Sequence, residues 1–267
     1  MHYKDNNKTK NKMGKIISVA GQKGGCGKSS ITVLLASMLA YKFGKKVLVI
    51  DADSTQHTLQ NCREDDIAAV YDGRDAKNAG FSLSNKTKAD IYEAYLANRG
   101  ESLEPYEIME VPMEPNAIGE QLNRKKDYDF VIVDMPGSVE NEWYFSIVSK
   151  FDVVFVPFTV DTFVFNSNFP YAQVLQDVVM KAPESNLKKI YWFWNRYVEN
   201  EGKELRARME KIIKEKLPDV EPLSEWLGDS RAMLRPSCRS TLFTPVGKYA
   251  AYGNFSACVE EMCNKIM

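Results

Sequence analysis

Short apolar runs and helical patterns alternate along this chain from residue 16 to its last segment. Continuous apolar runs are typical of strands that are buried on both faces of a parallel sheet. The predicted strands lie at residues 16–20, 47–50, 106–111, 128–133, 153–156 and 190–194. The helical patterns lie at residues 31–43, 88–98, 116–125, 165–180, 201–216 and from Phe255 onward. Strands that alternate with helices predict an α/β fold: a doubly wound, mostly parallel sheet flanked by helices.

The length of 267 residues suits one large α/β domain or two small ones. Residues 15–267 contain no linker, repeat or low-complexity break, so we expect them to form a single domain. Residues 1–14 carry four lysines among polar residues and predict a flexible basic tail. Such a tail is more often a solvated linker than a DNA contact. The pattern weakens between residues 59 and 100 and predicts no role for that region.

A glycine-rich loop joins the first predicted strand to the first predicted helix. Its glycines let the backbone turn several N–H groups toward one point, where an anion can bind. The positive end of the following helix adds to this attraction. Strand, loop and helix in this order predict a phosphate-binding loop. The residues expected to contact the phosphates are Lys23, Gly24, Gly25, Cys26, Gly27, Lys28, Ser29 and Ser30.

Within this loop, Lys28 is placed to neutralise the β- and γ-phosphates of a nucleotide, and the Ser29 hydroxyl to bind Mg²⁺. Asp51, Asp53 and Asp134 follow predicted strands, and ligands of open α/β sheets bind at the carboxyl ends of strands. Asp134 is placed to hold Mg²⁺ through a water molecule. Turn carboxylates at strand ends are the plain alternative for Asp51 and Asp53.

The loop departs from the common G-x-x-x-x-G-K-[ST] pattern, because Gln22 replaces the first glycine and a second lysine, Lys23, begins the loop. The sequence K-G-G-C-G-K-S resembles the deviant Walker A loop of the ParA/MinD family of P-loop ATPases. The segment from Asp51 to Gln56 resembles the family's switch I, although Ser54 stands where the family usually has proline. Asp134-Met135-Pro136-Gly137 resembles its switch II. The resemblance covers residues 15–267 and is closest to the ParA partitioning branch.

This resemblance implies a P-loop NTPase fold, ATP and Mg²⁺ as cofactors, and hydrolysis of ATP to ADP and phosphate. In the family the early lysine, here Lys23, reaches the partner's nucleotide across a homodimer. Lys28 and Asp53 complete the catalytic set, with Asp53 orienting the attacking water, and Asp51 lies near Mg²⁺ without binding it. Asn195 ends the sixth predicted strand and matches an amide that reads the adenine edge of ATP. A turn or cap asparagine is the alternative.

The family resemblance also implies the partners: a homodimer in the ATP-bound state, non-specific DNA, and a DNA-binding adaptor protein that stimulates hydrolysis. The expected role is the partition or transfer of a plasmid or mobile DNA element. The net charge of −1 gives no global basic field, so DNA contact requires a local patch. One candidate patch lies in the helical segment 201–216, where Lys203, Arg206 and either Lys211 or Lys214 can share a face; a solvated helix of mixed charge is the plain alternative. The other patch holds Arg231, Arg235 and Arg239.

The cysteines and the apolar runs of the chain argue against disulfide-rich, iron–sulfur and membrane proteins. Five cysteines without a C-x-x-C motif argue against a disulfide framework and indicate a reducing, cytoplasmic setting. Their spacing does not suit an iron–sulfur carrier. No apolar run reaches the roughly 18 residues that span a membrane. The C-terminal helix has Lys265 as its one basic residue, which disfavours a membrane-targeting helix. The alternatives that remain are a MinD-like positioning ATPase, another metabolic or carrier protein of the superfamily, and a nucleotide-binding module without turnover.

Overall fold

The computed structural model describes residues 13–53, 58–74, 92, 95–96, 104–137, 142–229, 239–244 and 254–267. Nearly all of the predicted basic tail and most of the predicted helix at 88–98 lie outside these residues. The described chain forms a seven-stranded sheet in the order β3-β2-β4-β1-β5-β6-β7, and every neighbouring pair is parallel. The strands are β1 (Lys15–Val19), β2 (Val47–Asp51), β3 (Glu107–Glu110), β4 (Phe130–Asp134), β5 (Val153–Phe158), β6 (Lys189–Trp194) and β7 (Val220–Pro222).

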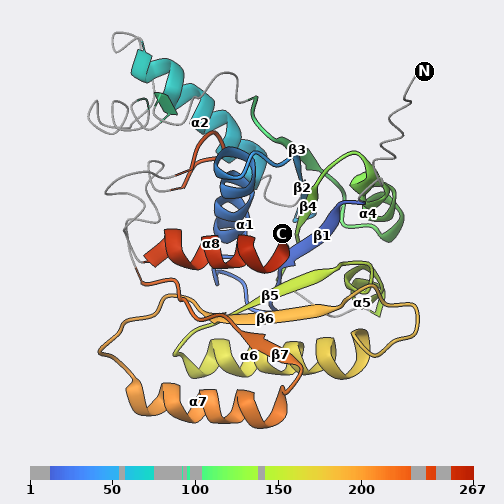
Figure 1. Ribbon diagram of the computed structural model, residues 1–267, viewed down its shortest axis with the longest axis vertical. Helices are drawn as coiled ribbons and strands as arrows, with labels where there is room; N and C mark the ends of the chain where they lie inside the picture. Colours follow the sequence, from blue (N-terminus) through green and yellow to red (C-terminus); the bar gives the residue numbers. More distant parts are fainter. Residues whose placement is uncertain are drawn as a thin grey trace, which may run out of the picture.

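Helices cover both faces of this sheet (Figure 1). One face carries α1 (Lys28–Ser37), which continues as the π-helical turn η1 (Met38–Lys42), together with α2 (Thr58–Arg74) and α8 (Phe255–Ile266). The other face carries α4 (Pro115–Leu122), the 3-10 turn η3 (Asn123–Lys126), α5 (Glu142–Val148), α6 (Thr162–Val174), its π-helical extension η4 (Leu175–Val179), and α7 (Lys203–Lys216). The predicted doubly wound α/β fold is therefore confirmed.

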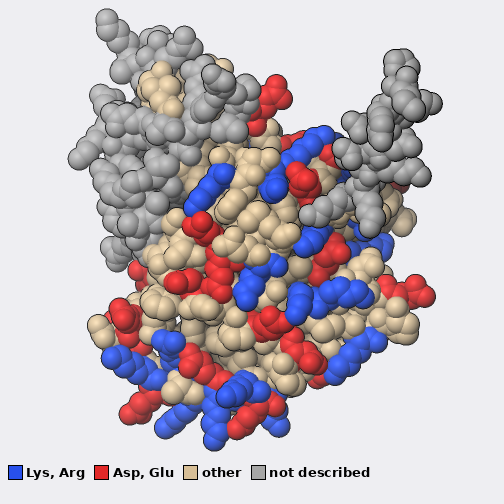
Figure 2. All heavy atoms as spheres, in the orientation of Figure 1, with Lys and Arg blue, Asp and Glu red and all other residues tan. Residues whose placement is uncertain are grey.

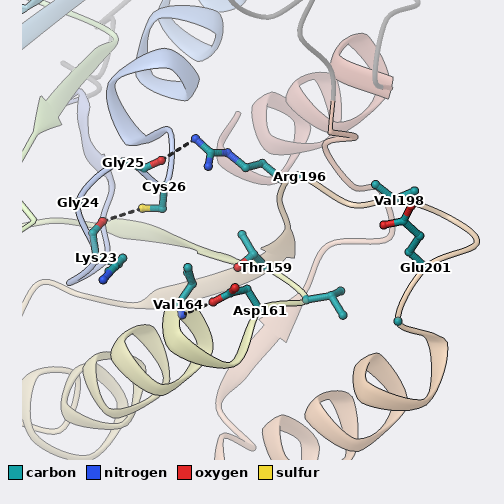
Figure 3. Close-up of a pocket in the computed structure, with 12 residues that line it drawn as sticks. Lys23, Gly24, Gly25, Cys26, Thr159, Asp161, Val164, Arg196, Val198 and Glu201 are labelled. Carbon is teal, nitrogen blue, oxygen red and sulfur yellow. Dashed lines mark hydrogen bonds between the residues drawn. The ribbon is translucent and has the colours of Figure 1, made fainter.

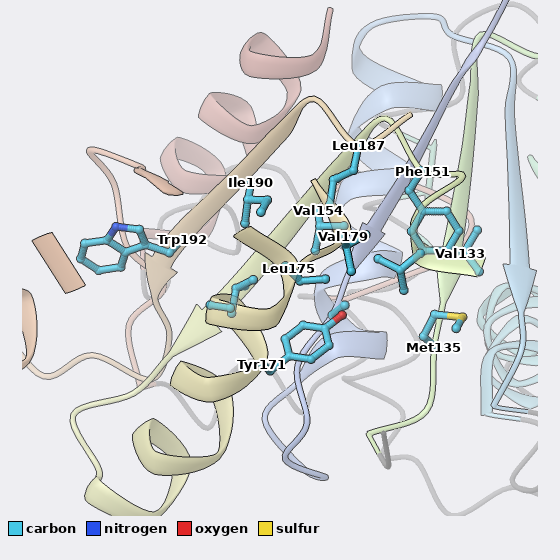
Figure 4. Close-up of a cluster of buried hydrophobic side chains, with 14 of the residues drawn as sticks. Val133, Met135, Phe151, Val154, Tyr171, Leu175, Val179, Leu187, Ile190 and Trp192 are labelled. Carbon is cyan, nitrogen blue, oxygen red and sulfur yellow. The ribbon is translucent and has the colours of Figure 1, made fainter. Parts of the chain in front are cut away.

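The central strands are continuous apolar runs because both of their faces are buried. In β1, Ile17 and Val19 pack in the cluster with α1 and α8, whereas Ile16 packs in the cluster on the opposite face. Figure 4 shows that opposite cluster, where Val154 and Ile190 of the sheet meet side chains of α6 and η4. Alternate residues of a strand point to opposite faces, so most positions take an apolar residue; the buried Ser18 of β1 donates its hydroxyl to the Val133 carbonyl at 2.7 Å.

The helix α2 and the short elements α5 and β7 were not predicted. Hydrophobic periodicity misses α2 because its buried face carries charged side chains: Arg63 is 9% exposed and Asp66 is 3% exposed. Arg63 donates hydrogen bonds to Thr241 Oγ1 at 2.8 Å and to the Tyr106 carbonyl at 3.0 Å. Asp66 accepts from both the amide and the hydroxyl of Thr241 at 2.7 Å. Because these buried groups are satisfied, a polar face holds α2 in place.

Membrane-spanning helices are not found in the part of the chain that the structure describes.

The carboxyl ends of β1, β2, β4, β5 and β6 lie at one edge of the sheet, since the strands are parallel. The predicted site residues lie at or just after these strand ends, in the loop after β1, or in the first turn of α1. The fold therefore brings residues from distant parts of the sequence to one edge.

Candidate functional site

The loop between β1 and α1 has a backbone that depends on two glycines. Gly25 has φ +71° and Gly27 has φ +83°, both in the left-handed region that favours glycine. Gly27 precedes the first residue of α1, so the helix begins at Lys28 with its N–H groups directed toward the loop. Backbone in this conformation forms a concave group of N–H donors that suits an anion. The geometry expected for a phosphate-binding loop is present.

Lys28 is 8% exposed, and its ammonium donates to the Lys23 carbonyl at 3.1 Å. The glycine that ends the Asp134-Met135-Pro136-Gly137 segment packs directly against it. A Cβ atom on Gly137 would lie 3.0 Å from Lys28 Nζ and 3.1 Å from the Gly24 amide nitrogen. The loop and the segment after β4 are thus in contact, which places Lys28 between them.

Asp134 is a buried carboxylate at the carboxyl end of β4. It is 1% exposed, and both of its carboxylate oxygens are buried without a hydrogen-bond partner among the described residues. Burial raises the pKa of Asp134 to about 7, and the charges of Asp51 and Asp53 add to the effect, whereas Ser29 and Lys28 oppose it. An orphaned carboxylate beside a serine hydroxyl at the end of a phosphate loop suits a hard divalent cation such as Mg²⁺.

Asp51 lies beside Asp134 in the register of β2 and β4, and it has hydrogen-bond partners. Its Oδ1 accepts from the Asp53 amide at 3.2 Å, and its Oδ2 accepts from the Leu59 amide at 3.1 Å. Burial is the main cause that raises its pKa. Asp51 therefore ties together the two chain segments on either side of residues 54–57 and fixes the backbone that carries Asp53. The position of Asp51 near Mg²⁺ stays a prediction.

Asn195 follows β6 and is 3% exposed. Its Nδ2 donates to the Cys26 carbonyl at 2.7 Å, and its Oδ1 accepts from the Arg196 amide at 2.9 Å. Both ends of the amide are engaged with the protein, so in this structure Asn195 holds the phosphate loop. The predicted contact with the adenine edge would use the second N–H of Nδ2 and the second lone pair of Oδ1, and it stays a prediction.

Two residues that hold the loop escaped the sequence prediction. Asn168 of α6 is fully buried; its Oδ1 accepts from the Lys23 amide at 3.2 Å and its Nδ2 donates to the Pro157 carbonyl at 2.7 Å. Arg196 donates from Nη2 to the Gly25 carbonyl at 2.6 Å. Neither stands in a motif. For Arg196, its place directly after a strand that ends at the site was the available signal.

A cleft of about 610 Å³ opens beside the loop (Figure 3). Three segments line it: the loop residues Lys23 to Cys26, the turn between β5 and α6 with the first turn of α6, and the turn between β6 and α7. The Lys23 side chain is exposed. On the opposite wall the Thr159 hydroxyl is buried and has no hydrogen-bond partner within the described residues. The site thus combines a buried lysine, Lys28, with an exposed one at the edge of an open cleft.

The basic residues of the two candidate DNA patches make different contacts in the structure. Arg239 donates to the Ser30 hydroxyl in the first turn of α1 at 2.7 Å, and Arg231 and Arg235 lie outside the described residues. On α7, Arg206 pairs with Glu210 at 2.7 Å and Lys211 lies 3.9 Å from Glu215. Figure 2 shows basic and acidic side chains interleaved over the lower edge of the molecule, where Figure 1 places α7. This face of α7 is mixed in charge, not uniformly basic.

Two curated proteins show similarity to part of the chain. An uncharacterised ATP-binding protein of Methanocaldococcus jannaschii is 29% identical over 152 residues, which are 53% of this chain and 53% of that protein. The sporulation initiation inhibitor protein Soj of Bacillus subtilis is 32% identical over 142 residues, which are 48% of this chain and 51% of Soj. The chain spans about half the length of the curated relatives it matches.

Solved structures resemble the whole fold at low sequence identity. A plasmid partition protein of Borrelia burgdorferi has a TM-score of 0.54 at 20% identity, over 96% of this chain and 100% of that one. The septum site-determining protein MinD of Pyrococcus horikoshii, complexed with Mg-ADP, has a TM-score of 0.56 at 16% identity, with 95% and 96% covered. The pNOB8 ParA bound to nonspecific DNA has a TM-score of 0.52 at 17% identity, with 94% and 99% covered. These likenesses concern the fold.

The family itself is established by the match to AAA_31, described as an AAA domain, over residues 14–178. This match covers more than half of the chain and includes the loop, Asp51, Asp53 and Asp134. The remaining site residue, Asn195, lies beyond it. The chain therefore belongs to the AAA_31 family of AAA domains, and its fold is the P-loop fold of the ParA and MinD structures.

Proposed function

We propose that this chain is an ATP-binding and slowly hydrolysing switch that dimerises when ATP is bound and acts in the partition or transfer of a plasmid or other mobile DNA element. One observation carries the proposal: an exposed lysine begins a phosphate loop whose second lysine is buried against Gly137, beside the orphaned carboxylate of Asp134. The similarity to Soj and to a plasmid partition protein supports the choice of role.

In this proposal the chain's own groups divide the work of phosphoryl transfer to water. The backbone N–H groups of the loop and Lys28 bind and neutralise the β- and γ-phosphates. Ser29 would bind Mg²⁺ directly and Asp134 would hold it through a water molecule, and the ion would further neutralise the phosphate charge. Asp53 orients the attacking water and accepts its proton. Asp51 fixes the backbone of Asp53 through the 3.2 Å hydrogen bond described above.

The two lysines differ in a way that supports a shared site. Lys28 is buried at the base of the loop, whereas the Lys23 side chain is exposed and lines the open cleft. Within the described residues, Lys23 contributes hydrogen bonds through its backbone amide and carbonyl, so its ammonium is not required to build the loop. An exposed cation at the edge of the site can complete the partner's site across a homodimer.

DNA and an adaptor protein are the remaining proposed partners. A ParA of the same fold is bound to nonspecific DNA, which supports the first. Because the net charge is −1, the DNA contact must come from a local patch, and α7 is a described helix rich in lysine and arginine. The adaptor is a DNA-binding protein that stimulates hydrolysis.

A MinD-like positioning ATPase is the second candidate, since MinD shares the fold. The packing of α8 favours partition over membrane positioning. Phe255, Val259, Met262 and Ile266 are at most 2% exposed and pack in the cluster with α1, so the apolar face of this helix is not available to a lipid surface. We expect no co-sedimentation with anionic liposomes; ATP-dependent co-sedimentation would favour the MinD-like role.

The test is DNA binding with ATP, with ADP and without nucleotide, for the wild type and Lys28→Ala. We expect ATP to raise the affinity of the wild type for random-sequence DNA by about 10-fold or more, because a dimer doubles the number of phosphate contacts. The log affinity should fall steeply with log salt. Lys28→Ala should lose the ATP effect. An affinity that is independent of ATP and of salt would contradict the proposal.

A further inference from the structure

Two consecutive residues after β6 hold two consecutive carbonyls of the phosphate loop. Asn195 Nδ2 donates to the Cys26 carbonyl at 2.7 Å, and Arg196 Nη2 donates to the Gly25 carbonyl at 2.6 Å. Figure 3 shows the Arg196 side chain extending across the cleft wall to Gly25. The Asn195 oxygen accepts from the Arg196 amide, so the amide nitrogen must be the end that faces the loop.

Because the peptide bond is planar, fixing these two carbonyls also fixes the direction of two backbone N–H groups. A trans peptide is planar, and its C=O and N–H point in opposite directions. The Gly25 carbonyl shares a peptide plane with the Cys26 N–H, and the Cys26 carbonyl shares one with the Gly27 N–H. Fixing both carbonyls toward β6 therefore directs both N–H groups to the other side of the loop. These N–H groups come immediately before Lys28, where phosphate-binding loops present their donors.

The backbone at Arg196 is itself held in a costly conformation. Its φ of +53° lies in the left-handed region, where a residue with a side chain carries strain of about 1 kcal/mol or more. The neighbouring backbone is fixed on both sides: the Asn195 amide donates to the Phe158 carbonyl at 2.7 Å, and the Tyr197 amide donates to the Leu227 carbonyl at 2.9 Å. Hydrogen bonds on both sides of Arg196 therefore hold this conformation, and the guanidinium reaches the loop.

The phosphate loop has a glycine, Gly27, where Asn195 approaches it. A Cβ atom on Gly27 would lie 3.3 Å from Asn195 Nδ2, and the φ of +83° disfavours any other residue there. Because Gly25 and Gly27 both have positive φ and wide conformational freedom, a loop held only by its own backbone would sample many arrangements. Contacts from outside the loop are needed to keep one of them.

We propose that Asn195 and Arg196 are positioning residues of the ATPase site: they clamp the Gly25 and Cys26 carbonyls, so that the Cys26 and Gly27 N–H groups face the phosphate chain of ATP before it binds. The clamp rests on the proposed ATP binding. It gives Asn195 a role that does not depend on adenine, and it gives Arg196 a role in a site where no motif places it. Preformed donors bind phosphate without the entropy cost of ordering the loop.

Arg196→Gly is the most informative variant, because glycine adopts a φ of +53° without strain while the side chain that carries the guanidinium is removed. We expect its thermal unfolding midpoint to equal or exceed that of the wild type, while its affinity for ATP falls about 10-fold. Arg196→Lys, which keeps a donor, should recover part of the affinity. Asn195→Asp should weaken ATP binding at least as much, because a carboxylate cannot donate to the Cys26 carbonyl. Lys189→Leu, at the opposite end of β6, serves as the control and should bind ATP like the wild type.

A second measurement separates the clamp from ATP binding itself. Backbone ¹⁵N order parameters of residues 25–27 in the nucleotide-free wild type should be near 0.85, and they should fall to about 0.6 in Arg196→Gly and Asn195→Asp. Unchanged order parameters, or wild-type ATP affinity in both variants, would overturn the clamp. A wild type that has an ordered loop but binds no ATP would instead overturn the proposed function, and with it the purpose of the clamp.

Discussion

Lys23→Ala should leave ATP binding within about twofold of the wild type and abolish the ATP-dependent dimer. The structure explains why the two effects separate. The Lys23 amide donates to Asn168, and its carbonyl accepts from Cys26 and Lys28, so every hydrogen bond described for this residue uses its backbone. Alanine keeps these backbone bonds and removes the exposed side chain beyond Cβ, with its ammonium. The molecular mass measured by light scattering with ATP and with ADP checks this result.

Two variants serve as controls for this prediction. Lys28→Ala should lose both ATP binding and the dimer, because the buried ammonium is placed to neutralise the phosphates themselves. Lys181→Ala removes an exposed lysine that pairs with Asp177, away from the cleft, and should behave like the wild type. If Lys23→Ala dimerises normally with ATP, Lys23 has no part in the interface.

Asp134→Asn should have two opposite effects. Hydrolysis should fall by at least about 100-fold, because an amide cannot replace the carboxylate that is placed to hold Mg²⁺. The nucleotide-free protein, by contrast, should become more stable at pH 8, by about 1–3 kcal/mol in the free energy of unfolding. The wild type buries this carboxylate without a hydrogen-bond partner among the described residues, and the variant removes its charge.

The pH dependence of this stability difference follows from the pKa of Asp134. Burial raises that pKa from 3.8 to about 7 in the folded protein, so the folded state binds the proton more tightly than the unfolded state. Below about pH 4 the protonated Asp134 therefore does not lower the free energy of unfolding. Between about pH 4 and pH 7 the loss of this proton lowers the free energy of unfolding progressively, and above about pH 7 the loss is complete. Urea unfolding with a chelator should show a larger gain for Asp134→Asn at pH 8 than at pH 5. Asp219→Asn, an exposed matched control, should show little change, and an equal gain at both pH values would contradict this account of Asp134.

The strands and the phosphate loop could be predicted because their signals are local. A strand buried on both faces is a continuous apolar run, and the loop is a run of glycines that follows such a strand directly. By contrast, α2 is stabilised by buried polar contacts to Thr241, which lies 178 positions from Arg63. No local pattern can reveal that a charged face is satisfied by a distant segment.

In the site, too, the hydrogen-bond partners of single residues could not be predicted from the sequence. Asn195 stands at the predicted strand end, but its partner, the Cys26 carbonyl, lies 169 positions away and was not foreseen. Arg239 was assigned to a candidate DNA patch, whereas its side chain reaches the Ser30 hydroxyl 209 positions earlier. Asn168 lies within a helical pattern that offers no hint of its contact with Lys23. Residue type and position were predictable, but the partners depend on the packing of helices and strands.

The most direct test of the shared site mixes two inactive variants, Lys23→Ala and Asp53→Asn, and measures ATP hydrolysis. Each variant alone should be nearly inactive: the first cannot supply the lysine to its partner, and the second cannot orient water. In a mixed dimer the Lys23→Ala subunit keeps its own Asp53 and receives Lys23 from the other subunit. Because Lys23→Ala does not pair with itself, it forms dimers only with Asp53→Asn, and each mixed dimer has one complete site of two. An equimolar mixture should therefore recover up to about half of the wild-type rate per site. A mixture no faster than its separate components would contradict a site completed by the partner's Lys23.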